Sequence, residues 1–82
     1  PTMAVKSSSA LKGLVQEVGS NLATISLGSA DGVTEGMIFH VTRGNEFICD
    51  IVITDVDVNK SAGTMRLVQQ QPIVGDNVST EL

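Results

Sequence analysis

Hydrophobic and polar residues alternate along most of the chain, with β-branched residues and glycines in place of any helical periodicity. Over residues 22–27, for example, Ala23, Ile25 and Leu27 share one predicted face of a strand. The pattern predicts strands at residues 14–18, 22–27, 37–42, 47–56, 62–68 and 76–80, with order beginning near Leu11. Six short strands separated by turn residues favour an all-β fold, a small six-stranded barrel that is closed or nearly closed.

The same alternation assigns inward-facing residues to other predicted strands. Met37, Phe39 and Val41 point into the barrel from the third strand. Met65 and Leu67 do so from the fifth. All of these side chains are therefore expected in the core.

The fourth predicted strand is too apolar for a plain alternation. Its aliphatic residues cannot all share one face: Ile48, Ile51, Val52, Ile53 and Val56. Either a β-bulge near Cys49 or Thr54 shifts the phase of the strand, or both of its faces are covered.

The fourth predicted strand also places an apolar side chain on the outer surface of the barrel. If Ile51 and Ile53 point inward, Val52 points out of the barrel, beside Ile38 of the preceding strand. Small barrels commonly bury leftover apolar faces in a partner, so Ile38 and Val52 are the candidate interface residues. The alternative is that they are scattered exposed aliphatic residues without a role.

The segment between the second and third strands is rich in glycine. Gly28, Gly32 and Gly36 can adopt positive φ at low cost, which allows a tight loop over residues 28–36. Asp31, placed before Gly32, is expected to accept a hydrogen bond from a backbone amide two residues later, and Asp76 after Gly75 is expected to do the same. The predicted structural turn residues are therefore Gly28, Asp31, Gly32, Gly36, Gly75 and Asp76.

Three segments of the first half are echoed, in the same order, in the second half. Residues 15–18 align with 53–56, residues 23–27 with 63–67, and residues 33–39 with 72–78. The echo predicts a pseudo-two-fold barrel made by internal duplication, whose halves cannot bury their apolar faces alone. Coincidence between simple β patterns is the alternative.

Composition limits the classes of partner. A length of 82 residues allows one small domain, and a net charge of −4 repels the phosphate backbone of nucleic acids. One Cys and one His cannot build a structural zinc site or an intrachain disulfide. No run approaches the roughly 18 apolar residues of a membrane span, so this chain is not expected to insert into a membrane.

The ends of the chain suggest one domain preceded by a linker. Lys6 and the three serines after it contribute nothing to a core. We therefore predict a flexible linker or a remnant of excision at residues 1–10 and a single β-barrel domain at residues 11–82.

Two segments share features with ligand-binding loops without completing either motif. Residues 28–32 lack the Lys-Ser/Thr pair and the following helix of a phosphate-binding loop. Residues 55–59 carry oxygen-bearing side chains at alternate positions, but Lys60 and Arg66 stand where a calcium loop has Gly and Glu. Both segments are predicted to be turns, and neither a cofactor nor a metal is expected.

His40 and Cys49 carry the remaining chemistry. A hairpin closed near Gly44 brings residues near 40 opposite residues near 49, which would make a nucleophile–base pair. Because no third group orients the imidazole, such a pair would catalyse poorly. Cys49 is predicted instead to be a small buried apolar residue, and the protein is not expected to be an enzyme.

The run from Ile25 to Gly44, the residues Ile48, Ile51 and 53–56, and the closing segment 72–78 resemble a small β-barrel module of bacterial cell-envelope proteins. The module is similar to the C-terminal domain of a flagellar assembly protein and to modules that follow a membrane anchor and a coiled coil. The likeness covers residues 13–82, and it departs from the pattern at Cys49, where such modules often have Gly. It implies assembly or scaffolding in the bacterial cell envelope or periplasm, with the cytoplasm left open, and no common substrate.

The combined expectation is a non-catalytic structural or protein-interaction module from a larger bacterial envelope protein. It would bind a protein partner or self-associate as a homo-oligomer, without nucleic acid. The alternative is a small-ligand-binding barrel in which the loop at residues 28–36 and the turn near Gly75 form a paired rim.

Overall fold

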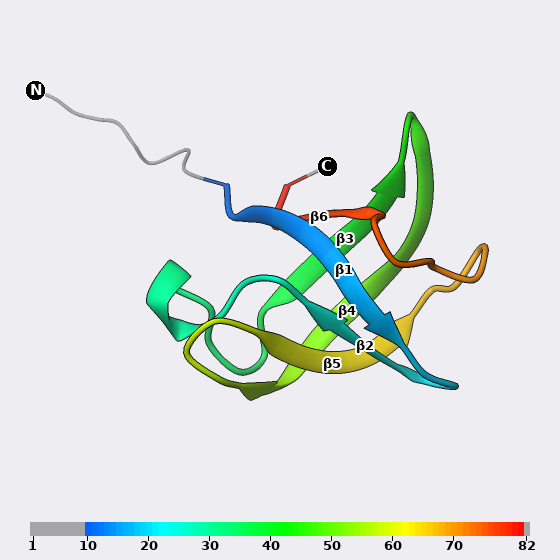
Figure 1. Cartoon of the computed structure of the whole chain (residues 1–82). Coiled ribbons are helices and arrows are strands. Elements are labelled where there is room, and N and C mark those ends of the chain that lie inside the picture. Colours follow the sequence, from blue (N-terminus) through cyan, green and yellow to red (C-terminus); the bar gives the residue numbers. More distant parts are fainter. Residues whose placement is uncertain (1–9, 82) are drawn as a thin grey trace, which may run out of the picture.

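The computed structural model describes residues 10–81 of the chain. Within them the strands are β1 (Lys12–Val18), β2 (Leu22–Ile25), β3 (Ile38–Arg43), β4 (Glu46–Val56), β5 (Ser61–Arg66) and β6 (Asn77–Ser79), with one 3₁₀ turn, η2 (Ser29–Asp31). The strands form a closed antiparallel barrel in the order β1-β2-β5-β4-β3-β6 (Figure 1). The predicted all-β fold and six-stranded barrel are therefore confirmed. Of the predicted linker, only Ala10 lies among the described residues.

The barrel encloses one continuous apolar core, to which every strand contributes. Its buried members are Val15, Ala23, Ile25, Leu27, Val33, Phe39, Val41, Ile48, Cys49, Ile51, Ile53, Met65 and Val78. The predicted inward positions of Phe39, Val41 and Met65 are confirmed, and Met37 packs against the edge of this core. No helix among residues 10–81 has the length and hydrophobicity needed to cross a membrane.

The predicted inward position of Leu67 is wrong. β5 ends at Arg66, and Leu67 adopts a left-handed conformation, with φ at 52°, that turns the chain away from the sheet. The Leu67 side chain is consequently 64% exposed. The chain then crosses to β4, where the backbone N–H groups of Gln69 and Gln70 both donate to the carbonyl of Ile48.

Two β-bulges explain the apolar run of β4. Val41 lies opposite Cys49 and Thr42 opposite Phe47, which leaves Ile48 as an extra residue. Further along, Thr54 is the extra residue where the pairing with β5 shifts. Both predicted bulge positions are therefore confirmed, and the first bulge buries the consecutive residues Ile48 and Cys49.

Close backbone approach explains the glycine in the middle of β5. A Cβ atom at Gly63 would collide with the backbone carbonyl of Val52 on β4. Gly63 lies opposite Ile53, immediately before the Thr54 bulge, where β4 bends over β5. The residue type is therefore set by packing between the two strands.

The two halves of the barrel have matching hydrogen bonds. Gly36 N–H donates to the Ile53 carbonyl at 2.8 Å, and Gly75 N–H donates to the Val15 carbonyl at 2.9 Å. Both glycines have positive φ, 88° and 98°. Val15 in β1 and Ile53 in β4 therefore occupy equivalent places in the two halves.

The bulges and strand order agree with this equivalence. Gln16 is the extra residue after Val15 in β1, as Thr54 is after Ile53 in β4. Exchanging β1 with β4, β2 with β5 and β3 with β6 leaves the strand order of the closed barrel unchanged. The backbone therefore has a pseudo-two-fold arrangement, while the origin of the chain by duplication stays a prediction.

One part of the predicted echo is displaced. The sequence aligned Ala23 with Gly63, but the pairing of the strands equates Ile25 with Gly63, since these residues lie opposite Val15 and Ile53. A shift of an even number of residues keeps the same side chains inward. It also makes Met65, rather than the exposed Leu67, the counterpart of the buried Leu27.

Candidate functional site

Four outward-facing residues form a continuous row across the barrel surface. Ile38 lies opposite Val52, Val52 opposite Thr64, and Thr64 opposite Leu22, on β3, β4, β5 and β2. Residues directly opposite one another in antiparallel strands project from the same face, so these side chains are neighbours. We call them the apolar row. The structure places Val52 beside Ile38 as the sequence predicts, and their role as an interface stays a prediction.

The ends of the apolar row are open to solvent. Ile38 is 44% exposed and Leu22 is 51% exposed, whereas Val52 and Thr64 are half-buried between them. Burying an exposed aliphatic side chain stabilises a contact by about 1 kcal/mol or more. Burial of Ile38 and Leu22 by a partner would therefore stabilise a complex.

The other half of the barrel has an equivalent row of different composition, which we call the polar row. In the same order, its members are Asn77, Leu14, Ser26 and Lys60. Asn77 lies opposite Leu14, as Ile38 lies opposite Val52. The backbone is the same in both rows, and the outer aliphatic residues of one are replaced by an amide and a cation in the other.

The hairpin turns confirm the last pair of counterparts. Gly19 N–H donates to the Leu22 carbonyl at 2.7 Å, and Asp57 N–H donates to the Lys60 carbonyl at 2.8 Å. Leu22 and Lys60 therefore occupy equivalent positions at the start of β2 and just before β5. An aliphatic side chain is not required by the backbone at this position.

A second difference between the halves lies next to Leu22. Thr34 and Glu35 precede Gly36 in one half, whereas Ile73 and Val74 precede Gly75 in the other. Val74 is 65% exposed. Together with Leu22 and Val18, Val74 borders an open hollow of about 550 Å³. The apolar character of the surface thus continues from the apolar row toward the loop before β6.

A charged row runs beside the apolar row. It consists of His40, Asp50 and Arg66, which lie opposite one another on β3, β4 and β5. His40 Nδ1 and Asp50 Oδ1 are 2.6 Å apart. Arg66 is exposed and makes no hydrogen bond or ion pair with any residue in the part of the chain described. The guanidinium of Arg66 is therefore available to a partner.

The structure does not bring His40 and Cys49 together. Asp50 occupies the position opposite His40, and Val41 is opposite Cys49. His40 lies on the outer surface, whereas the Cys49 side chain is fully buried. The barrel wall separates them because neighbouring residues of a strand point to opposite faces. The nucleophile–base pair considered from the sequence is therefore wrong.

Cys49 instead has the environment of a packing residue. Burial away from water, reinforced by the negative charges of Asp50 and Asp76, raises the pKa of its thiol to about 11. The thiol is therefore protonated at neutral pH and unreactive. The prediction of a small buried apolar residue is confirmed.

Asp31 and Asp76 accept hydrogen bonds in the direction opposite to the predicted one. Asp31 Oδ2 accepts from the backbone N–H of Gly28 at 3.0 Å, and Asp76 Oδ2 accepts from that of Ile73 at 2.9 Å. Each donor lies three residues before its aspartate rather than two residues after it. The reason is that each segment forms a tight turn, in which the aspartate N–H donates to the carbonyl of Gly28 or Ile73 and the carboxylate lies over the start of the same turn.

The glycine loop is held against the turn between β4 and β5. Ser29 N–H donates to the Asp57 carbonyl and Ala30 N–H to the Val58 carbonyl. A Cβ atom at Gly28 would collide with both carbonyls. Because Gly28 has no side chain, the turn between β4 and β5 packs directly against its backbone and fills the space at this end of the loop.

Asp76 also anchors β6 to β3. Its carboxylate accepts two hydrogen bonds from the Arg43 guanidinium, at 2.8 and 2.9 Å, and its side chain is buried. The hydrogen bonds from Arg43 and Ile73 hold the pKa of Asp76 below its ordinary value, although burial acts in the opposite direction. The residue thus connects the end of β3, the loop before β6 and β6.

The two glycine turns do not share a rim. Gly36 bonds to β4 and Gly75 bonds to β1, and these strands are opposite in the closed order of the barrel. The turns therefore lie on opposite sides (Figure 1). A single ligand of small size does not reach both.

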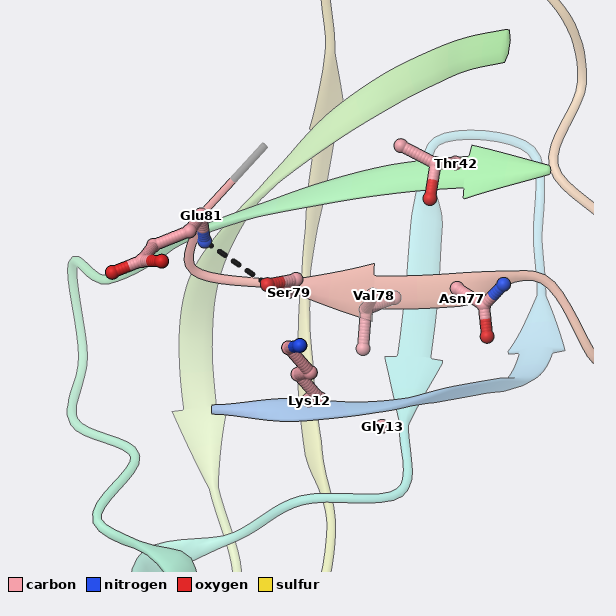
Figure 2. Close-up of a pocket in the computed structure, with 7 residues that line it drawn as sticks. All are labelled: Lys12, Gly13, Thr42, Asn77, Val78, Ser79 and Glu81. Atoms are coloured by element: carbon pink, nitrogen blue, oxygen red, sulfur yellow. Dashed lines mark hydrogen bonds between the residues drawn. The ribbon is translucent and has the colours of Figure 1, made fainter. Parts of the chain in front are cut away.

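A separate open hollow of about 330 Å³ lies over β6, and Figure 2 shows the residues that line it. The side chains of Lys12, Thr42, Asn77 and Ser79 surround it, and Ser79 Oγ accepts a hydrogen bond from the Glu81 N–H at 3.0 Å. Lys12 and Asn77 are exposed, Thr42 and Ser79 are half-buried, and Glu81 completes the lining.

No three His, Cys, Asp or Glu side chains gather as a metal site among residues 10–81. Comparison with protein-family models, with curated proteins and with solved structures gave no match. The residues of the chain and their geometry are therefore the basis for assigning a function.

Sequence reasoning missed half of the apolar row. The outward direction of Leu22 could have been inferred, because it precedes the inward-facing Ala23. Its proximity to Val52 could not, because β2 and β4 are both neighbours of β5 and are not neighbours of each other in sequence. No feature of the sequence indicated that Arg66 would have neither a hydrogen-bond partner nor an ion-pair partner among the described residues.

Proposed function

We propose that the domain is a non-catalytic protein-interaction module that contributes to assembly through the apolar row. The observation that carries the proposal is the difference between the two equivalent rows. Ile38 and Leu22 in one half correspond to Asn77 and Lys60 in the other, on matching backbones. A requirement of the fold would act on both halves alike, so these aliphatic residues serve something other than folding.

Burial by a protein surface is the purpose that fits the chemistry of the row. Exposed aliphatic side chains in a contiguous group, bordered by charged residues, are typical of protein contact surfaces. The resemblance to a β-barrel module of bacterial cell-envelope proteins supports an assembly or scaffolding role and a location in the envelope.

The alternative is a small-ligand-binding barrel that uses the glycine loops. It has less support, since the turns at Gly36 and Gly75 donate hydrogen bonds to strands on opposite sides of the barrel. In addition, backbone atoms of the turn between β4 and β5 occupy the space beside Gly28. A ligand would have to use one loop alone.

Photo-crosslinking compares the two rows directly. A photo-reactive residue is placed at Val52 or, as the matched control, at its counterpart Leu14, in the protein expressed in the cell that naturally makes it. The proposal predicts at least a fivefold excess of protein adducts from position 52, because its row would be covered. Equal yields from the two positions, with both variants folded by circular dichroism, would overturn the proposal.

A further inference from the structure

We infer that the occupant of the apolar row is a second copy of this chain, bound through a two-fold axis that runs along the strands between β4 and β5. This inference rests on the proposed function and adds the identity and geometry of the partner. The inference rests on the charged and apolar residues of β4 and β5. The rotation places the charged residues of one copy opposite residues of opposite charge in the other, and places the two apolar rows opposite each other.

The charged row shows the complementarity first. A two-fold axis parallel to the strands exchanges β4 with β5 and leaves positions along the strands unchanged. Asp50 on β4 then faces Arg66 of the second copy, and Arg66 faces Asp50 of the second copy. Two ion pairs form, and each uses a guanidinium that has no partner within the described chain.

The apolar row is matched by the same operation. Val52 faces Thr64 of the second copy at the centre, while Ile38 and Leu22 lie at the two flanks and exchange places across the axis. The flank at Leu22 borders the open hollow that Val74 also lines. The long side chain of Ile38 from the second copy lies toward this hollow, so an apolar group meets an apolar recess on each side.

The other orientation of a two-fold axis is disfavoured by charge. An axis along the rows, perpendicular to the strands, would bring Asp50 of one copy toward Asp55 of the other, since these residues lie on either side of Val52 on β4. Like charges placed opposite one another in a contact are destabilising. Only the axis along the strands pairs opposite charges, which is the reason for choosing it.

The size of the surface sets the expected strength. A stable protein contact buries about 800 Å² on each partner, which is a large share of the 4622 Å² that this small domain exposes. The contact uses two positions along each of the two central strands and one flanking residue on each side, which cover less than that. We therefore expect a weak dimer of the isolated chain, with a Kd of about 10⁻⁴ M.

Charge exchange tests the geometry. Sedimentation equilibrium is measured from about 10 µM to about 1 mM for the native chain, for Asp50→Lys, for Arg66→Glu, and for their equimolar mixture. Each variant alone would place like charges across the axis, so its Kd should rise at least tenfold. In the mixture, Lys at position 50 of one chain faces Glu at position 66 of the other, and mixed dimers should form with a Kd within threefold of the native value.

The outcomes separate this inference from the proposed function. A native chain that is monomeric at every concentration rejects the second copy as the partner, and the crosslinking comparison at Val52 and Leu14 still decides the function. A native dimer whose two variants fail to associate when mixed rejects the two-fold geometry. A native dimer that Val52→Asp leaves unchanged, or that Leu14→Asp weakens equally, rejects the apolar row itself as the contact.

A second measurement guards against a variant that does not fold. Val52→Cys and Thr64→Cys chains are mixed under mild oxidation, with Cys49 protected by its burial. The geometry predicts that the mixed disulfide exceeds both self-paired products at least threefold. A mixed product no more than twice as abundant as either self-paired product, which is what random pairing gives, contradicts it.

Discussion

Cys49 shows how burial controls the chemistry of a single residue. Its thiol lies inside the barrel with a pKa raised to about 11 by loss of water contact. We predict that a thiol reagent at pH 8 modifies the folded chain at least about a hundredfold more slowly than the urea-unfolded chain, because labelling requires opening of the barrel. Equal rates would show that the thiol is accessible. The rate can be followed by mass spectrometry.

The carboxylate of Asp76 makes the free energy of unfolding depend on pH. Because its pKa is lowered in the folded state, the stability it contributes is present above its unfolded value of 3.8 and is lost as pH falls through its folded value. We expect Asp76→Asn to reduce the free energy of unfolding by about 2 kcal/mol at pH 7. The difference from the native chain should shrink as pH falls below about 4.

Urea unfolding from pH 7 down to pH 2.5 measures this difference. Asp55→Asn is the matched control, because Asp55 is exposed and its carboxylate makes none of the side-chain hydrogen bonds found among residues 10–81. Its effect should stay within about 0.5 kcal/mol at every pH. A loss for Asp76→Asn that is the same at pH 7 and pH 2.5 would contradict the role assigned to the carboxylate.

At the scale of elements, the bulge at Thr54 sets which residues of β4 face the core. Because Thr54 is the extra residue, deleting it would place Asp55 directly after Ile53. Asp55 would still face outward and Val56 would still face the core, and only the bulge and its bend would be lost. We expect the deletion to leave the barrel folded and to reduce the free energy of unfolding by about 1–3 kcal/mol, because the bend of β4 at the bulge is lost. Thermal unfolding followed by circular dichroism measures the effect.

Thr54→Ala keeps the residue count and serves as the control for the deletion. The Thr54 side chain is exposed, and its hydroxyl makes one long hydrogen bond of 3.4 Å to the Ala62 carbonyl. The substitution should cost less than about 1 kcal/mol. If deletion and substitution were equally mild, the bend of β4 at the bulge would contribute nothing to the stability of the domain.

At the scale of the whole molecule, closure of the barrel depends on contacts between its halves. β2 pairs with β5, and β6 lies between β1 and β3, so each half contributes strands that the other completes. Peptides 10–44 and 45–82 should each be unfolded alone, because neither can bury its apolar face. Mixing them should restore the strand signal in circular dichroism. A cooperative thermal transition in either peptide alone would show that half a barrel is sufficient.

The local features of this barrel can be predicted from the order of its residues. Alternation of two residues fixed the strands and the inward faces of residues such as Phe39 and Val41, and the failure of alternation in β4 located both bulges. It also placed Val52 on the outside beside Ile38, since consecutive strands joined by a short turn pair with each other. It misplaced Leu67, because a single left-handed residue ends a strand without changing the pattern of polarity.

Which distant segments are neighbours follows from the closed barrel and not from the pattern of residues. A period of two residues states which face a side chain occupies, but it carries no information about which strand lies alongside. The pairing of β2 with β5 therefore had to be seen before Leu22 and Thr64 joined Val52 in one row. The matched polar row, which gives the apolar row its meaning, likewise exists only where closure of the barrel makes the two halves comparable.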